Sequence, residues 1–177
     1  MTRHVFLDET KQRGYVVAAA AVVAGDLEPL RRVVRELVLP GQRRLHMKTE
    51  RDSRRREIVA AFVGSGVEVV IYDASKRYPT DREARGECLR AVVADAATAV
   101  GETRLVLEQD DSLVQWDGQR LIELARAAGC RDRVRYDHLR ASAEQLLAVP
   151  DAVAWCWARG GEWRSRVEPV VHLVRDV

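Results

Sequence analysis

The chain has 177 residues, of which 47% are hydrophobic and 32% are charged, as expected for one folded domain with a sizeable core. No apolar run approaches the roughly 20 residues of a membrane span, and acidic residues appear by position 8, which excludes a signal-peptide pattern. The net charge of +2 points to no particular partner, and three widely spaced cysteines exclude a zinc ribbon or a disulfide framework, so we expect a single cytoplasmic domain over residues 1–177.

The chain is expected to begin with a β-hairpin. Its first strand covers about Arg3–Asp8, and its second covers about Gly14–Val23, a stretch rich in valine and bracketed by glycines. Apolar residues at helical spacing predict a helix over Leu27–Leu37, which ends before Pro40. A short strand is then predicted over Arg43–Lys48.

The middle of the chain alternates between helix and strand patterns. A helix is predicted over Ser53–Val63, and the nearly continuous apolar run Val67–Tyr72 indicates a strand that is covered on both faces. A capping box, Thr80-x-x-Glu83, opens a long helix that reaches Val100. The next strand is predicted over Thr103–Glu108.

The last third begins with a helix that starts at Asp111 or Ser112 and ends at Ala128. A weak strand follows over Val134–Tyr136. The pattern Ser142-x-x-Gln145 is a second capping box, and it predicts a late helix that carries Asp151.

This late helix contains a proline and ends near Gly160. Either the helix starts again at Pro150, which suits a first-turn position, or it is kinked there. The tail Val167–Val174 predicts a final strand, at an edge because of Pro169. A hairpin followed by alternating helices and strands indicates an α/β fold with a mixed β-sheet flanked by helices.

Acidic residues at strand ends are the strongest functional signal. Asp8 closes the first strand, Glu108 closes a later one, and Asp151 lies in the late helix. A carboxylate within apolar sequence is costly unless something pairs with it, and converging carboxylates repel one another and favour a divalent cation such as Mg²⁺ or Mn²⁺. Two such ions can activate a water and stabilise the leaving oxygen in phosphodiester cleavage.

The alternative for such acids is a purely local role, because acidic residues after strands are often turn residues or helix caps. We expect this role for Asp110 and Asp111, which precede a predicted helix.

Two further features suggest a phosphate-containing partner. His46 is either a metal ligand, a proton shuttle or a phosphate contact, or else a partly exposed polar residue. Clustered positive charge can bind a nucleic-acid backbone, and the candidate contacts are Arg51, Arg54, Arg55 and Arg56. The alternative is a solvated helix face in an arginine-biased protein, which has only three lysines among its 29 basic residues.

Other enzyme classes find no support in the sequence. The chain has no glycine-rich phosphate loop and no Gly-x-Ser-x-Gly motif, which argues against a nucleotide-cofactor enzyme and a serine hydrolase. Trp155, Trp157 and Trp163 are expected to serve packing rather than base stacking.

Three segments resemble a large family of uncharacterised RNase H-like proteins. Phe6-Leu7-Asp8-Glu9-Thr10 resembles the family's opening strand, Phe-x-Asp-Glu followed by Ser or Thr. Leu45-His46 resembles the segment after its first helix, and the stretch from Leu146 to Trp155 resembles its late helix, Leu-Gln-x-Ala-Asp-x-x-Ala. The order and spacing of the three segments agree with the family and span nearly the whole chain.

The resemblance implies an RNase H-like fold with a two-metal acidic site. Asp8 and Asp151 match the family's site positions, and Glu108 matches the acid that closes the fourth strand of the fold. The chain departs from the family at two positions: Arg44 stands where members often carry a glutamate, and Pro150 replaces a small residue.

The sequence therefore predicts a Mg²⁺- or Mn²⁺-dependent nuclease or a related phosphodiester-processing enzyme. Asp8, Glu108 and Asp151 are the predicted metal ligands, with His46 as an auxiliary proton or phosphate contact. The alternative is a non-catalytic RNase H-like module that binds nucleic acid or a protein partner, since a fold does not establish a function.

Overall fold

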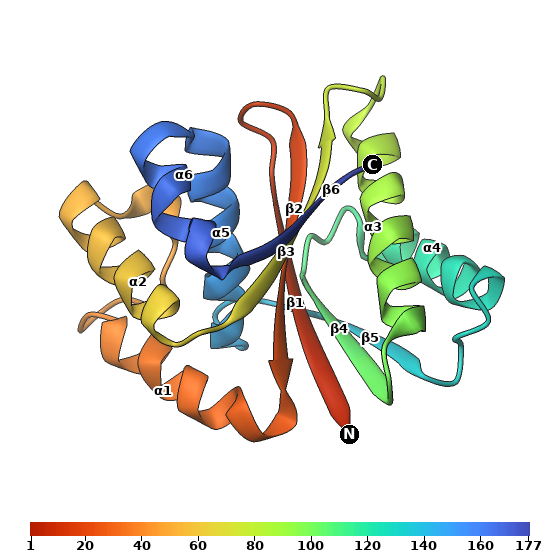
Figure 1. Ribbon diagram of the computed structural model, residues 1–177, viewed down its shortest axis with the longest axis horizontal. Helices are drawn as coiled ribbons and strands as arrows, with labels where there is room; N and C mark the ends of the chain where they lie inside the picture. The colour runs from red at the N-terminus through yellow and green to blue at the C-terminus, as the bar shows by residue number, and fades with distance from the viewer.

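A six-stranded mixed sheet organises the computed structural model, which describes residues 1–177 (Figure 1). Its strands are β1 (Thr2–Thr10), β2 (Tyr15–Val23), β3 (Glu68–Ser75), β4 (Glu102–Glu108), β5 (Val134–Leu139) and β6 (Val171–Asp176). The spatial order is β5-β4-β1-β2-β3-β6, so the N-terminal hairpin forms the centre of the sheet. The β1–β2 and β2–β3 pairs are antiparallel, and the other three pairs are parallel.

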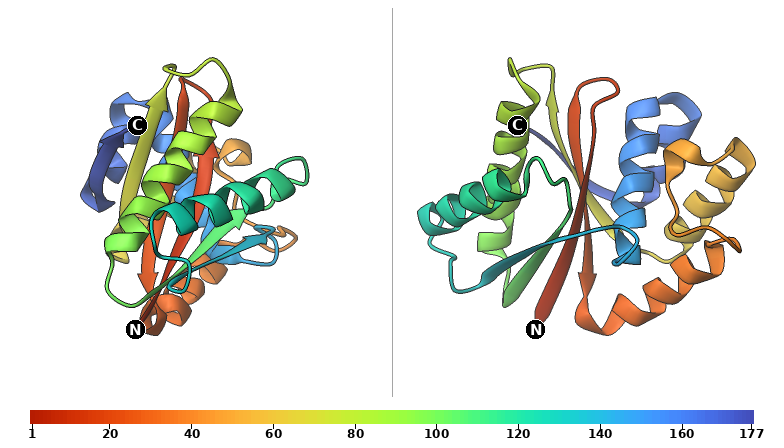
Figure 2. Two further views of the ribbon diagram at one scale, coloured as in Figure 1. Left: turned by 90° about the vertical axis from the view of Figure 1, so that its right-hand side faces the viewer. Right: turned by 180° about the vertical axis from the view of Figure 1, so that it is seen from behind.

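Helices cover both faces of this sheet. They are α1 (Leu27–Leu37), α2 (Asp52–Gly64), α3 (Asp81–Thr98), α4 (Val114–Ala127), α5 (Ala148–Arg159) and α6 (Gly161–Val167). Figures 1 and 2 show α1, α2, α5 and α6 on one face and α3 with α4 on the other. Short 3₁₀ turns are η1 (Ala24–Asp26), η2 (Met47–Thr49), η3 (Gln145–Leu147) and η4 (Glu168–Val170). No helix is both long and apolar enough to cross a membrane.

Each face of the sheet has its own hydrophobic core. Side chains of a strand alternate between the faces, so Phe6 of β1 packs in the core beneath α5 while its neighbours Val5 and Leu7 pack beneath α3 and α4. The two-layer cover explains why β2 and β3 are apolar on both faces.

The tight β1–β2 hairpin depends on one glycine. Gly14 has φ +123°, and a Cβ atom there would lie 2.8 Å from the backbone of Ser75 in β3. The glycine lets the hairpin end pack directly on the neighbouring strand.

The structure confirms the predicted fold class and several local signals. Thr80 and Glu83 form the reciprocal capping box at the start of α3. Pro150 lies in the first turn of α5, as in the first of the two alternatives, but the helix begins at Ala148 rather than at Pro150 itself. The final strand is an edge strand, as predicted.

The predicted strand over Arg43–Lys48 was wrong. Leu45 and Met47 are both buried, and this alternation imitates a half-buried strand. The segment nevertheless pairs with no strand of the sheet and ends in η2. Alternate side chains are buried here because an extended loop packs on the core.

Three boundaries also differ from the prediction. Ser142 does not cap the late helix; the side chain of Glu144 accepts the backbone N–H of Leu146 instead, at 3.1 Å. Asp110 accepts the N–H of Ser112 at 3.0 Å in a local turn, so α4 starts only at Val114. The helix α6 was not predicted, and it delays the last strand to Val171.

A buried charged network lies on the α3/α4 face. Arg85 of α3 donates Nε and Nη2 to the two carboxylate oxygens of Asp117 in α4, both at 2.7 Å. Its Nη1 contacts Glu9 at 3.0 Å and Tyr15 at 3.1 Å, while Nε2 of His138 lies 3.1 Å from Asp117. Burial alone raises the pKa of Asp117, but the hydrogen bonds from Arg85 and His138 outweigh it and hold the pKa below its ordinary value.

We expect Asp117→Asn to lower the free energy of unfolding at pH 7 by about 3 kcal/mol, because removing one partner of a buried ion pair leaves the other charge uncompensated. A carboxyl with a lowered pKa stabilises the fold above its unfolded-state pKa of about 3.9, and that contribution is lost as the pH falls through the folded-state value. The difference between the two proteins in urea unfolding should therefore shrink below about pH 4.

Asp137→Asn is the matched control, because Asp137 pairs with Arg104 at 2.6 Å on the surface. An exposed pair is expected to contribute less than about 1 kcal/mol. Equal losses in the two variants would contradict a stabilising role of the buried network.

Candidate functional site

The parallel register of β1 and β4 places two acids side by side. Leu7 of β1 pairs with Leu107 of β4, so the next residues, Asp8 and Glu108, leave neighbouring strands at the same level. Adjacent strands lie about 4.8 Å apart. Side chains two positions apart in a strand lie on the same face of the sheet. Phe6 and Val106 belong to the core beneath α5, so Asp8 and Glu108 lie on that face as well.

The third acid, Asp151, comes from the first turn of α5, which packs on β1 over that face. Its Oδ2 accepts the backbone N–H of Met47 at 2.9 Å and lies 3.4 Å from Nδ1 of His46. The structure thus brings together His46 and Asp151, which are 105 positions apart in the sequence.

The charges of its acidic neighbours act on the pKa of Asp8. Burial is the main cause that raises the pKa of Asp8 well above its ordinary value, and the charges of Asp151 and Glu108 add to the rise. The side chain is more than nine-tenths buried, and its one hydrogen bond is the Glu9 N–H to Oδ1, at 2.8 Å. Burial and the acidic neighbours therefore disfavour the charged form of Asp8, and the Glu9 N–H offsets this only in part.

One loop segment, 44–47, supplies partners to the other two acids. Arg44 forms an ion pair with Glu108, and His46 faces Asp151. The contact with Asp151 raises the pKa of His46, and burial opposes the rise only in part. The segment is anchored by the buried side chain of Met47, whose carbonyl oxygen accepts Nε of Arg55 at 2.8 Å.

No group of three or more histidine, cysteine or acidic side chains is placed so that it could hold a metal ion. Carboxylate oxygens are nevertheless the ligands that Mg²⁺ prefers, and this ion is usually held by one or two carboxylates while it keeps several waters. Oδ2 of Asp8 accepts no hydrogen bond, and Asp151 lies close enough to act on its pKa. The chemistry of these carboxylates suits an ion that keeps several waters, whereas three protein ligands for one ion are not present.

A polar cavity of about 450 Å³ lies beside Asp8 and Glu108. Another open cavity of similar volume, about 460 Å³, lies elsewhere on the surface. The polar cavity is lined by Asp8, Glu9, Glu108, Gln109, Asp110 and Asp111. Of the outer two acids, Asp110 accepts hydrogen bonds from Ser112, and Asp111 pairs with Arg140 at 2.9 Å. These two acids are occupied by local contacts, while Asp8 remains open to a ligand.

The four arginines predicted to bind nucleic acid divide into two pairs. Arg54 and Arg55 of α2 are largely buried and donate to the backbone carbonyls of Leu37 and of Met47. Arg51 and Arg56 are exposed. Only the second pair is available to a partner without loss of contacts to the main chain.

The tryptophans lie in the core, as expected, with arginines over their rings. Trp155 and Trp163 are buried and meet edge to face at 5.2 Å between ring centroids. The guanidinium of Arg55 lies 4.4 Å from the ring centre of Trp155, and that of Arg56 lies 5.6 Å from the ring centre of Trp163.

Two features of the site were not predicted. The Arg85 network was missed because Arg85, Asp117 and His138 lie on three separate elements, and no short motif links them. The pairing of Arg44 with Glu108 was also missed, although Arg44 stands out in the sequence as a departure from the family pattern.

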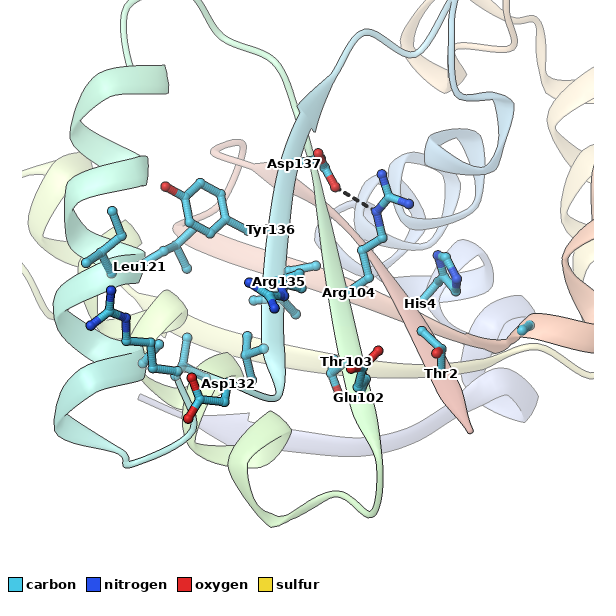
Figure 3. A pocket seen from close by; sticks show the side chains of 17 residues that line it. Thr2, His4, Glu102, Thr103, Arg104, Leu121, Asp132, Arg135, Tyr136 and Asp137 are labelled. Carbon is cyan, nitrogen blue, oxygen red and sulfur yellow. Dashed lines mark hydrogen bonds and ion pairs between the residues drawn. The ribbon is translucent and has the colours of Figure 1, made fainter.

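The largest cavity, about 940 Å³, lies away from the acids, at the opposite ends of β1 and β4 (Figure 3). Thr2, Glu102 and Thr103 are among its lining residues. Figure 3 shows an ion pair between Arg104 and Asp137 within it. It contains no converging carboxylates and is not the candidate site.

Thiol chemistry is also disfavoured. All three cysteines are free and buried, and burial raises the pKa of Cys88 and of Cys156 to about 12. A thiol is nucleophilic as the thiolate, so neither of these two is reactive near neutral pH.

The chain matches no protein-family model, and no curated protein sequence is similar to it. Solved structures are similar in fold. A chain of the PCNA:RNase HII complex from Archaeoglobus fulgidus has a TM-score of 0.58 and 16% identity, over 88% of this chain and 72% of that chain. Ribonuclease H2 from Pyrococcus horikoshii OT3 has a TM-score of 0.54 and 14% identity, over 86% and 70%.

Bst-RNase HIII in complex with Mn²⁺ has a TM-score of 0.51 and 15% identity, over 87% of this chain and 51% of that chain. The order of the sheet, the N-terminal hairpin and these three likenesses agree on the architecture. The protein has an RNase H-like fold.

Proposed function

We propose that the protein is a divalent-metal-dependent nuclease or a related phosphodiester-processing enzyme. The observation that carries the proposal is Asp8, a buried carboxylate of β1 that lies level with Glu108 of β4, on the face covered by the helix α5 that carries Asp151. The RNase H-like fold of the chain and the Mn²⁺ complex of one similar structure support it.

In this proposal Asp8 and Asp151 hold a Mg²⁺ or Mn²⁺ ion, and Glu108 is the third acid of the site. Such an ion supplies Lewis-acid stabilisation of negative charge on a phosphate. Asp8 is fixed by the Glu9 N–H and Asp151 by the Met47 N–H, so both carboxylates are oriented before a ligand arrives.

His46 provides the proton chemistry. Its Nδ1 faces Asp151, which leaves Nε2 free to contact a phosphate or to give up a proton. Because Asp151 raises its pKa, His46 holds a proton to a higher pH than an isolated histidine does.

The substrate in this proposal is a nucleic acid, and the exposed residues Arg51 and Arg56 of the predicted arginine cluster contact its backbone. Arg55 acts indirectly, because it holds Met47 in the loop that carries Arg44 and His46, while Arg54 holds the end of α1 at Leu37. The free cysteines suit a cytoplasmic location.

The second candidate is an RNase H-like module that binds nucleic acid or a protein partner without catalysis. The pairing of Glu108 with Arg44 favours it, because one acid of the set is neutralised by the protein itself. Metal binding separates the two candidates, since the non-catalytic module has no need of an ion.

The metal prediction is tested by thermal melting. An ion that binds only the folded state stabilises it by about 2.7 kcal/mol at one hundred times its dissociation constant. We expect the wild-type protein to melt at a higher temperature in millimolar Mn²⁺ than in chelator. Asp8→Asn and Asp151→Asn should each lose most of that gain, whereas Asp132→Asn, an exposed acid far from the site, should keep it.

The same melting experiments in chelator test whether repulsion between Asp8 and its acidic neighbours destabilises the fold. Asp8→Asn should be no less stable than the wild type, because a buried charge that repels two neighbours has been removed. If Asp8 serves only as a turn residue, the substitution costs about 1 kcal/mol through a weaker hydrogen bond, and Mn²⁺ changes neither protein. Flat metal curves for the wild type would rule out the enzyme.

The nucleic-acid prediction concerns exposed arginines. The double variant Arg51→Ala/Arg56→Ala should weaken binding to oligonucleotides of any sequence, and it should lower the salt slope of the binding constant by roughly one unit per lost phosphate contact. Fluorescence anisotropy over a range of salt concentrations measures both effects. The control Arg126→Ala/Arg131→Ala removes two exposed arginines from α4 and from the loop after it, and should change neither. Equal effects of the two variants would indicate non-specific attraction.

A further inference from the structure

A cavity of about 160 Å³ lies between the sheet and α3, on the face of the sheet opposite the acidic site. Residues of β1, β2, β3, β4 and β6 form its floor, and residues of α3 form its roof. Figure 2 shows α3 lying across this face of the sheet. None of the predicted site residues lines the cavity, so its role is separate from that of the acids.

Small apolar side chains leave this space open. Ala19 and Ala21 of β2 and Ala96 of α3 line the cavity, and each side chain ends at its Cβ atom. The larger side chains Val5 and Leu105, which also line it, are apolar as well. An apolar cavity of about 150 Å³ is known to hold a molecule the size of benzene. The interior of this cavity therefore suits a short hydrocarbon group.

One charged side chain of the cavity lacks a partner. Arg3 of β1 lines the cavity, and its Nε is buried and donates no hydrogen bond. An acid of the same lining, Asp95, is already occupied, because it accepts the Tyr72 hydroxyl at 2.8 Å and Nε of Arg175 at 2.7 Å. A buried N–H without an acceptor is costly, and more so when the group is charged. Arg3 thus presents a donor for which the protein supplies no acceptor.

A second buried polar atom without a partner lies next to Arg3. In the parallel register Arg3 pairs with Thr103 of β4, and both side chains lie on the α3 face, because Val5 and Leu105 belong to the core there. Thr103 is 1% exposed, and its Oγ1 has no hydrogen-bond partner. The third such side-chain atom of the protein is Nε of Arg54. Unmet hydrogen bonds are therefore concentrated at this part of the α3 face.

We propose that the cavity binds a small monocarboxylate, with its carboxylate on Arg3 and a short hydrocarbon tail among Ala19, Ala21 and Ala96. A carboxylate offers two acceptor oxygens that match the planar donors of a guanidinium. The tail removes its apolar surface from water inside the cavity. The volume limits the tail to roughly six carbon atoms, the size of benzene. This site goes beyond the proposed function, since it lies on the other face of the sheet.

An acid at the edge of the cavity acts against an anionic ligand. Glu68 of β3 lines the cavity and is exposed, so its carboxylate repels a bound anion. Replacing it with a neutral side chain should strengthen the binding of a carboxylate. A neutral ligand of the same shape should bind equally well before and after the substitution. The charge of the ligand can thus be tested separately from its fit.

Methyl NMR titration with sodium isovalerate tests the proposal, because this probe joins a carboxylate to a branched aliphatic tail. We expect a dissociation constant on the order of 1 mM and shifts of the methyl signals of Ala19, Ala21 and Ala96. The methyl signal of Ala152, on the opposite face in α5, should not move. Isovaleramide, which lacks the charge, and acetate, which lacks the tail, should each bind roughly tenfold more weakly. Unmoved alanine signals would overturn the inference. Equal binding of acetate would indicate an adventitious ion only and would overturn it as well.

Charge variants test the role of Arg3. Arg3→Gln should weaken the binding of isovalerate by roughly tenfold and remove its preference over isovaleramide. Arg32→Gln is the matched control, since Arg32 is an exposed arginine of α1 on the opposite face, and it should change neither value. Glu68→Gln should tighten the binding of isovalerate and leave that of isovaleramide unchanged. An unchanged affinity for isovalerate in Arg3→Gln would contradict the recognition of a carboxylate.

A variant that fills the cavity tests the position of the tail. Ala96→Leu places a larger side chain in the space that the ligand would occupy, and it should abolish binding while Arg3 is intact. Ala21→Val narrows the cavity from the side of the sheet and serves the same purpose if Ala96→Leu does not fold, as judged by its melting curve. An unchanged affinity in a folded filling variant would show that isovalerate binds elsewhere and would overturn the inference.

Discussion

The parallel pairing of β1 with β4 is the constraint on which the rest of the site depends. The pair Leu7 and Leu107 is the last one between these two strands, so the next residues, Asp8 and Glu108, lie at the same level on one face. The helix α5 lies over that face and adds Asp151. Like charges at this spacing repel one another, and each acid must be compensated or bear the cost. The contacts around these acids offset that repulsion.

Each acid is compensated in a different way. Glu108 has the guanidinium of Arg44, and Asp151 has His46. Glu9 turns to the opposite face, where Arg85 holds it together with a second acid in α4. Asp8 alone has no positive partner, and burial with two negative neighbours raises its pKa. The same strand end thus combines a satisfied network on one face with an unsatisfied carboxylate on the other.

What the sequence predicted well was local or periodic. The hairpin, the capping box at Thr80 and the end of β4 at Glu108 depend on residues close together in the chain and were located correctly, whereas β1 continues two residues beyond Asp8. The segment Arg43–Lys48 was mistaken for a strand because alternate burial of a packed loop has the same pattern.

Contacts between distant elements could not be predicted from the sequence. Arg85 and its acidic partner in α4 are 32 residues apart, and Arg44 meets Glu108 across 64 residues. Neither spacing carries a motif, because such pairs are set by how helices and loops pack on the sheet. The predicted convergence of Asp8 and Asp151 rested on the placement of the two acids and on the family resemblance, and it stays a prediction.

The energetics of Asp8 bear on the choice between an enzyme and a non-catalytic module. Its one hydrogen bond, from the Glu9 N–H to Oδ1, would still be accepted, though more weakly, by the amide oxygen of an asparagine. An asparagine there would avoid the burial of a charge and its repulsion by Asp151. A carboxylate at this position therefore lowers the free energy of unfolding in the absence of a ligand. That loss is recovered only when a cation binds to the folded state. A module without an ion gains nothing from Asp8, whereas an ion-binding site requires it, and this asymmetry favours the metal-dependent function.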